Sequence, residues 1–303
     1  MSTALLVAQP GPTEVLPADT AQTRDSLVPN PYSPFPGPYD TLDLSEHTVV
    51  FSVDDGYQTV FSYIYPLLKQ HGMTMTLAPI VNYLGEGKPS YQPGAGFLNI
   101  AEIREMRDSC AIEIASHSLS HPFLTRLDSA EAWAEISRSK AVLESIFHTE
   151  VITFVYPYGD ANARIRRFTR LAGYKLGRAV RPGDVNLWVE PFRVPIFELR
   201  QETRLADVKH RVARHQTTIL LLHQIVPQPT VFTQWNLADF ADLLDWMEST
   251  GVRVATLEDL YREWWYERLG RFMEQVRATY GNERKSLLFE DVDVDATGAA
   301  HSR

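Results

Sequence analysis

The chain has 303 residues, of which 44% are hydrophobic and 22% charged, so it is long enough for one large domain or two modest ones. Its 38 acidic residues outnumber 29 basic ones and give a net charge of −9, and no run of Lys and Arg occurs, which argues against a nucleic-acid-binding protein. The single cysteine, Cys110, excludes an internal disulfide, and no stretch approaches the roughly 18 apolar residues of a membrane span.

The first 40 residues have the composition of an extension rather than of a folded domain. Five prolines lie between Pro29 and Pro38, and they favour extended backbone over helix. The short apolar patch near the start follows no basic segment and ends at Pro10, whereas a secretory signal needs a basic start and a longer apolar stretch. We therefore expect a Pro-rich N-terminal extension over residues 1–40 and a cytoplasmic protein.

From Leu44 onwards, short apolar runs alternate with segments whose apolar residues recur at helical spacing. Strands that alternate with crossover helices form a parallel sheet. Seven or eight such units in about 220 residues favour a closed α/β barrel over an open sheet. Strands are predicted at 49–53, 73–80, 111–115, 151–155, 175–179, 193–196, 217–222 and 252–255. Helices are predicted at 60–71, 99–108, 129–147, 161–171 and 237–249. A further helix follows the strand at 193–196 and ends at about residue 215, and a long last helix starts at about residue 257.

We expect the barrel to occupy residues 41–262, followed at 263–303 by a C-terminal helix and an acidic, disordered tail. One side of the long helix carries apolar residues, which predict that it caps the barrel. The alternative is that this apolar side is a dimerisation surface of a homo-oligomer. The apolar residues of the helix are Leu260, Trp264, Trp265, Leu269, Phe272, Val276 and Tyr280.

Polar residues follow four of the predicted strands directly. They lie in the stretches Asp54-Asp55-Gly56, His117 to His121, Tyr156 to Gly159, and at His223. Asp-Gly alone is a common turn. In a parallel α/β barrel, however, the carboxyl ends of the strands share one face, and active sites are built there. We therefore expect the four stretches to meet at one rim.

The residue types at this rim suit metal-assisted hydrolysis of an amide. Two histidines four residues apart would lie on one face of a helical turn, so that His117 and His121 converge on one ion. Two histidines and one carboxylate leave positions open for water and substrate. The second carboxylate can then act as a general base, and a separate histidine can protonate the leaving amine. Backbone N–H groups of the Pro-Tyr-Gly turn can stabilise the oxyanion.

In their order, these motifs resemble those of the NodB-homology polysaccharide deacetylases, over roughly Leu44 to Leu260. Ser52 to Gly56 is similar to the family's opening motif, His117 to His121 matches its His-Ser/Thr-x-x-His motif, and Leu221 to His223 matches its Leu-x-His motif. The resemblance implies an irregular (β/α)₇ barrel that acts on N-acetylated sugars, most often N-acetylglucosamine units.

The resemblance also implies a role for each matching residue. Asp54 would be the catalytic base, and His223 the general acid. Asp55, His117 and His121 would bind the metal, and the main-chain N–H of Tyr158 would contribute to the oxyanion hole.

Two departures from the family pattern concern residues that assist the base and the acid. Val155 stands where the family's third motif has the arginine that orients the base, and Arg178 or Arg181 could supply the missing guanidinium from a neighbouring strand end. The family's Asp-Trp pair is not recognisable. Asp184 and Trp188 are weak candidates for tuning His223 and for lining a sugar groove, and Asp184 fits a plain turn equally well.

The leading hypothesis is thus a metal-dependent N-deacetylase of an amino sugar in an oligo- or polysaccharide. The alternatives are an amide or imide hydrolase with a small non-sugar substrate, and a non-catalytic carbohydrate-binding barrel. Zn²⁺ is the first expectation for the metal, although Co²⁺, Ni²⁺ or Fe²⁺ also suit such a ligand set.

Overall fold

The computed structural model describes residues 42–85, 96–185, 190–280, 293–294 and 300–301, and the side chains within them up to residue 275. The predicted N-terminal extension, Trp188 and most of the predicted acidic tail lie outside these residues. None of the helices in the described part of the chain is long and apolar enough to cross a membrane.

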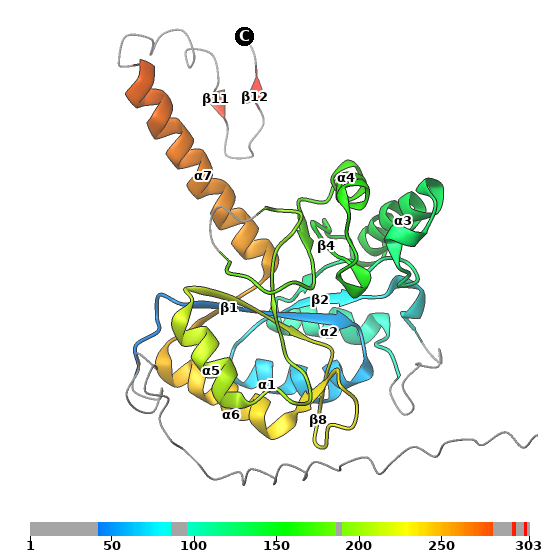
Figure 1. The fold of residues 1–303 in the computed structure, drawn as a ribbon, viewed down its shortest axis with the longest axis vertical. Coiled ribbons are helices and arrows are strands. Elements are labelled where there is room, and N and C mark those ends of the chain that lie inside the picture. Colours follow the sequence, from blue (N-terminus) through cyan, green and yellow to red (C-terminus); the bar gives the residue numbers. More distant parts are fainter. Residues whose placement is uncertain (1–41, 86–95, 186–189, 281–292, 295–299, 302–303) are drawn as a thin grey trace, which may run out of the picture. The chain divides into compact units, whose positions relative to one another are not determined.

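The centre of the fold is a parallel sheet built around β1 (Thr48–Asp55) (Figure 1). On one side β1 pairs along its length with β7 (Thr217–Leu222), which in turn pairs with β6 (Phe197–Glu198). On the other side the first half of β1 pairs with β10 (Arg253–Ala255), and its second half pairs with β2 (Thr76–Pro79). β3 (Glu113–Ile114) continues the sheet beyond β2. Seven residues of β1 are buried, as the apolar run predicts.

Single bridges connect this sheet to a second parallel pair, β4 (Thr153–Val155) and β5 (Leu176–Arg178). Ser116, just after β3, bridges to Phe154, and Arg178 bridges to Val194, shortly before β6. The strands therefore follow one another from β1 through β5 to the segment 194–198 and back through β7. This arrangement is α/β with parallel strands and is consistent with an irregular seven-stranded barrel.

The helices lie close to their predicted positions. After the π-helical turn η2 (Val60–Ile64) come α1 (Tyr65–Gln70), α2 (Ile100–Cys110), α3 (Ser129–Phe147), α4 (Ala163–Leu171), α5 (Leu205–Arg214) and α6 (Leu237–Thr250). α1 contacts α2 and α6, α5 contacts α6, and α3 packs against α4. Three short 3₁₀ turns are η3 (Val81–Tyr83), η4 (Leu124–Arg126) and η5 (Pro157–Gly159). Two pairs of short strands lie outside the main sheet: β8 (Gln224–Val226) pairs with β9 (Gln234–Asn236), and β11 (Asp293–Val294) pairs with β12 (Ala300–His301).

The last helix, α7 (Leu257–Tyr280), starts directly after β10, so the predicted boundary at residue 262 falls inside it. Its first turns are held by the barrel, where Leu260 and Trp264 are buried. Further along, Trp265, Leu269 and Phe272 are exposed. The helix therefore caps the core only with its beginning, and oligomerisation through the exposed part stays a prediction.

Candidate active site

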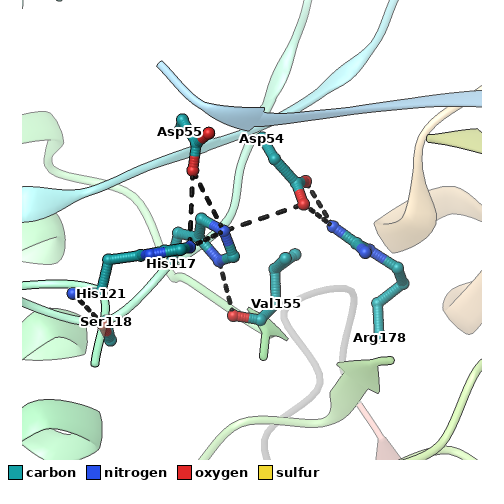
Figure 2. Close-up of polar contacts among 7 residues, drawn as sticks. All are labelled: Asp54, Asp55, His117, Ser118, His121, Val155 and Arg178. Atoms are coloured by element: carbon teal, nitrogen blue, oxygen red, sulfur yellow. Dashed lines mark hydrogen bonds and ion pairs between the residues drawn. The ribbon is translucent and has the colours of Figure 1, made fainter. Parts of the chain in front are cut away.

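Strand β1 ends in two buried carboxylates, Asp54 and Asp55, which are 2% and 4% exposed. Asp55 has a left-handed backbone, with φ of 68°, and Gly56 follows with φ of 80°. A Cβ on Gly56 would lie 3.0 Å from that of Pro79, so this close approach needs a glycine. The left-handed residue interrupts the alternation of the strand, and both carboxylates lie close to His117 (Figure 2).

The two histidines lie in a loop after β3, so the predicted helical turn is wrong. Ser118 and His121 both have left-handed backbones, with φ of 65° and 62°. The loop is held from inside, because the His121 N–H donates to Ser118 Oγ over 2.9 Å. It is also held from α3, where Glu135 accepts hydrogen bonds from the N–H groups of Leu119 and Ser120 and from the Ser120 hydroxyl. The loop that carries both imidazoles is thus fixed in part by a side chain from another element.

Asp55, His117 and His121 bring three ligand atoms into one small triangle. The two Nε2 atoms are 3.1 Å apart, and Asp55 Oδ1 lies 3.4 Å from His117 Nε2 and 3.5 Å from His121 Nε2. Ligand atoms about 2.1 Å from a tetrahedral metal are about 3.4 Å from one another. In addition, His117 Nδ1 donates to the Val155 carbonyl over 2.8 Å, which leaves Nε2 for the ion. The donor set fits a divalent metal.

The charges of this cluster depend on one another. Burial alone would raise the pKa of Asp55, but the hydrogen bond from His117 and the charges of His223, His117 and His121 bring the pKa well below its usual range. For His121, burial together with the neighbouring His117 lowers the pKa to about 4. A carboxylate and a neutral imidazole are the protonation states that metal ligation requires.

Asp54 contacts the guanidinium of Arg178, whose Nη2 reaches both carboxylate oxygens (Figure 2). Arg178 is the last residue of β5 and is fully buried, whereas Arg181 is exposed. The preceding Gly177 leaves room for Tyr156, because a Cβ there would lie 2.4 Å from the phenol oxygen. Of the two arginines considered from the sequence, only Arg178 reaches Asp54 among the described contacts.

Tyr158 lies in η5 with a left-handed backbone, φ of 57°. The turn is fixed, since Gly159 and Asp160 donate their N–H groups to Tyr156 and Pro157, and a Cβ on Gly159 would lie 2.6 Å from the Val180 nitrogen. The Tyr158 ring stacks on Phe123 at 3.9 Å between centroids and meets the edge of His121 at 4.4 Å. The Tyr158 ring is therefore packed against His121, whose side chain lines the same cavity.

One cavity of about 390 Å³ joins these groups. Its lining includes Asp54, Asp55, His117, His121, Tyr158 and His223, while Arg178 lies behind Asp54. His223 stands between β7 and β8, and its Nδ1 atom has no hydrogen-bond partner among the described residues. The arrangement thus combines a metal-ligand triangle, a separate carboxylate and a histidine around one accessible volume.

Comparison with known proteins identifies part of the chain. Residues 41–177 match the family described as polysaccharide deacetylase. This segment is therefore similar to polysaccharide deacetylases. The matched part contains Asp54, Asp55, His117, His121 and Tyr158, whereas Arg178 and His223 lie beyond its end. The resemblance inferred from the motifs is therefore confirmed for this segment, and the fold brings Arg178 to Asp54 and His223 to the same cavity.

Among curated proteins, the "Putative polysaccharide deacetylase YxkH" of Bacillus subtilis is 29% identical over 139 residues, 46% of this chain and 47% of the relative. The chain thus spans about half the length of this curated relative. Among solved structures, the deacetylase PplD of Streptococcus pyogenes is 21% identical, covers 48% of this chain and 62% of its own, and has a TM-score of 0.44. The family 4 carbohydrate esterase of Streptomyces lividans is 17% identical, with 69% and 90% coverage and a TM-score of 0.46.

The sequence-based predictions misplaced one residue and missed several others that lie in or near the cavity. Asp184 faces Arg211 and His215, each at 3.2 Å, so its suggested pairing with His223 is wrong. Glu135 gave no signal, since it is one of several glutamates on a helix. Glu198 and Phe232, which also line the cavity, follow no motif and become visible only when the strands are assembled.

Proposed function

We propose that the chain is a metal-dependent hydrolase that removes N-acetyl groups from an amino sugar in an oligo- or polysaccharide. The proposal depends on the triangle of Asp55, His117 and His121 at a cavity wall, with the buried Asp54 beside it. Three protein ligands leave a fourth position open, as in catalytic zinc sites. The family that residues 41–177 match supports the same reaction.

A divalent metal held by this triangle would polarise the acetyl carbonyl and lower the pKa of a water molecule. Asp54 is the general base that accepts the water proton, and Arg178 orients its carboxylate. The Tyr158 N–H donates to the carbonyl oxygen as negative charge develops there. The deprotonated water adds to the acetyl carbonyl carbon and forms the new C–O bond. His223 gives a proton to the leaving nitrogen, so that the amide C–N bond breaks and acetate and a free amine result. Zn²⁺ is the expected metal, and Co²⁺, Ni²⁺ or Fe²⁺ are also compatible with the ligands.

Two variants of the adjacent aspartates separate base from ligand. We expect Asp54→Asn to retain metal and to lose acetate release from N-acetylated oligosaccharides by about a thousandfold or more. Asp55→Ala is expected to lose both metal and turnover, because it removes one corner of the triangle. Asp184→Asn is the matched control, since this carboxylate lies outside the cavity lining. The measurements are metal content by elemental analysis and acetate release by metal-reconstituted protein.

Near-normal turnover by Asp54→Asn would refute the assignment of the base. Hydrolysis of a small non-sugar amide, with no acetate release from any N-acetylated sugar, would instead support the alternative amide hydrolase. A wild-type protein that binds sugar but is indifferent to chelator and releases no acetate would be a carbohydrate-binding barrel.

A further inference from the structure

Phe232 is a large apolar side chain on the rim of the cavity and is 57% exposed. Its loop is nevertheless firmly held. Gln201 donates its backbone N–H to the Phe232 carbonyl over 3.1 Å and its side-chain amide to Pro229 over 3.0 Å. The buried Trp235 donates its indole N–H to Thr203 over 2.8 Å. An exposed aromatic ring on a fixed loop, inside a cavity that holds catalytic groups, is typical of a ligand-binding surface.

A charged pair lies beside this ring. The Arg200 guanidinium lies over Phe232, 5.5 Å from the ring centroid, and donates to Glu198 Oε2 over 2.7 Å. Glu198 ends β6, and both members of the pair line the cavity. The hydrogen bond to Glu198 raises the pKa of Arg200, and the opposite formal charges of the two groups make the ion pair neutral as a whole. The Arg200 guanidinium and the Glu198 carboxylate thus place planar hydrogen-bond donors and acceptors next to the apolar ring of Phe232.

The two tyrosines of the cavity lining are already stacked on neighbouring rings. The ring of Tyr158 is stacked on Phe123 with only 11° between the planes, and the far side of Phe123 carries the guanidinium of Arg126 at 4.1 Å. Tyr57, the other tyrosine of the cavity lining, is fully buried and stacks on Phe97 at 5.1 Å between centroids. Phe232 is thus the cavity aromatic in the described part of the chain whose exposed face is free of ring stacking.

We propose that Phe232, Arg200 and Glu198 form a sugar-recognition subsite for an uncharged carbohydrate, which rests on the proposed deacetylase function. The C–H face of a pyranose ring packs on Phe232, as apolar surface does on aromatic rings. Neighbouring hydroxyl groups, each both donor and acceptor, bridge the Glu198 carboxylate and the Arg200 guanidinium. A charged substituent would compete with the pair, so neutral N-acetylated oligosaccharides are the favoured class.

The test uses N-acetylated chito-oligosaccharides and a small acetyl ester without a sugar. Phe232→Ala is expected to raise KM for the oligosaccharide about tenfold with kcat nearly unchanged, because the ring contributes binding and no chemistry. Cleavage of the ester should stay at the wild-type rate. Glu198→Gln should weaken oligosaccharide binding in the same sense. The control is Phe272→Ala, an equally exposed phenylalanine on α7, which should change neither substrate.

Binding is measured separately by titrating the oligosaccharide into Asp54→Asn protein with and without Phe232→Ala. Unchanged KM and unchanged binding in the Phe232→Ala proteins would overturn the subsite while leaving deacetylation in place. Oligosaccharide binding that depends on Phe232, with no acetate release by the wild type, would refute the proposed function and leave the subsite. A protein that neither binds nor deacetylates the oligosaccharide would refute both. Phe232→Leu, which retains apolar volume, shows whether ring stacking rather than folding is affected.

Discussion

Buried carboxylates lie at the carboxyl end of β1 and near the amino ends of β2 and β3, and the two sets differ in their partners. At the carboxyl end, Asp54 and Asp55 face Arg178 and two histidines. At the amino end, Glu113 begins β3 opposite Thr76, the first residue of β2. Glu113 accepts from the Thr76 hydroxyl over 2.7 Å and from the Glu258 N–H over 2.9 Å, and no cation pairs with it among the described contacts.

These partners have opposite effects on the two ends. Burial raises the pKa of Glu113 to about 7, although its hydrogen bonds lower it. At the other end, the imidazoles outweigh burial and lower the pKa of Asp55. Of the six non-glycine residues with positive φ in the described part of the chain, Asp55, Ser118, His121 and Tyr158 lie at the carboxyl end, whereas Ala111 and His148 end helices α2 and α3. Strained backbone and buried charge therefore coincide where chemistry is proposed, whereas the amino end ties the start of α7 to the sheet.

The largest effect is expected from removing Arg178, the cation that pairs with Asp54. Arg178→Met leaves a buried carboxylate without its partner, and we expect a loss of about 3–5 kcal/mol in the free energy of unfolding. Turnover should fall at least tenfold, because the base is no longer oriented. Denaturant unfolding and acetate release measure the two effects.

The control and the double variant make this test specific. Arg181→Met, at an exposed position three residues along, should change neither quantity. Adding Asp54→Asn to Arg178→Met should restore part of the stability without restoring turnover, because the uncompensated charge is removed. If Arg178→Met were as stable and as active as the wild type, the ion pair would have no role at this end of the sheet.

Local patterns in the sequence predicted the elements more fully than the contacts between them. The limits of α3 agree with its prediction, and a capping box of Asp128 and Glu131 explains its sharp start. The apolar run at residues 217–222 is strand β7. By contrast, whether Arg178 or Arg181 contacts Asp54 depends on where the fold places the end of β5 relative to the end of β1. Contacts between segments distant in the chain carry no short-range signal, so the partners of the motif residues required the fold.

A second test concerns how the histidine loop is positioned. Glu135 accepts three hydrogen bonds from Leu119 and Ser120, so Glu135→Ala should release the loop and lower metal affinity by about 10–100-fold. Glu135→Gln keeps one acceptor oxygen and should lose less. Competition with a chelator measures affinity, and thermal unfolding of metal-free protein detects a merely structural effect.

Glu144 on the same helix provides the matched control. It accepts from Lys140 and from the Val151 N–H, away from the cavity, so Glu144→Ala should affect stability but not metal affinity. Equal metal affinities in the wild type and Glu135→Ala would show that the left-handed loop holds its histidines without help from α3.

The last expected effect is a pH dependence of stability that originates at Glu113, the first residue of β3. An unfolded chain releases the Glu113 proton near 4.5, whereas the folded protein retains it until about pH 7. Between these pH values the folded state binds more protons than the unfolded state. The contribution of Glu113 to the free energy of unfolding is therefore complete below pH 4.5 and is lost as the pH rises through 7. Glu258, whose charge raises this pKa, and the hydroxyls of Thr76 and Thr153 face the carboxyl group.

Glu113→Gln removes this titration while retaining a group that can hydrogen bond. Relative to the wild type, the variant should gain about 2–3 kcal/mol of unfolding free energy as pH rises from 5 to 8. Urea unfolding across this range measures the difference, and the exposed Glu46→Gln should show none. A stability difference independent of pH would mean that Glu113 is ionised in the folded protein. The two ends of the sheet would then both bury charged carboxylates, and the contrast between them would lie in the cations and the strained backbone alone.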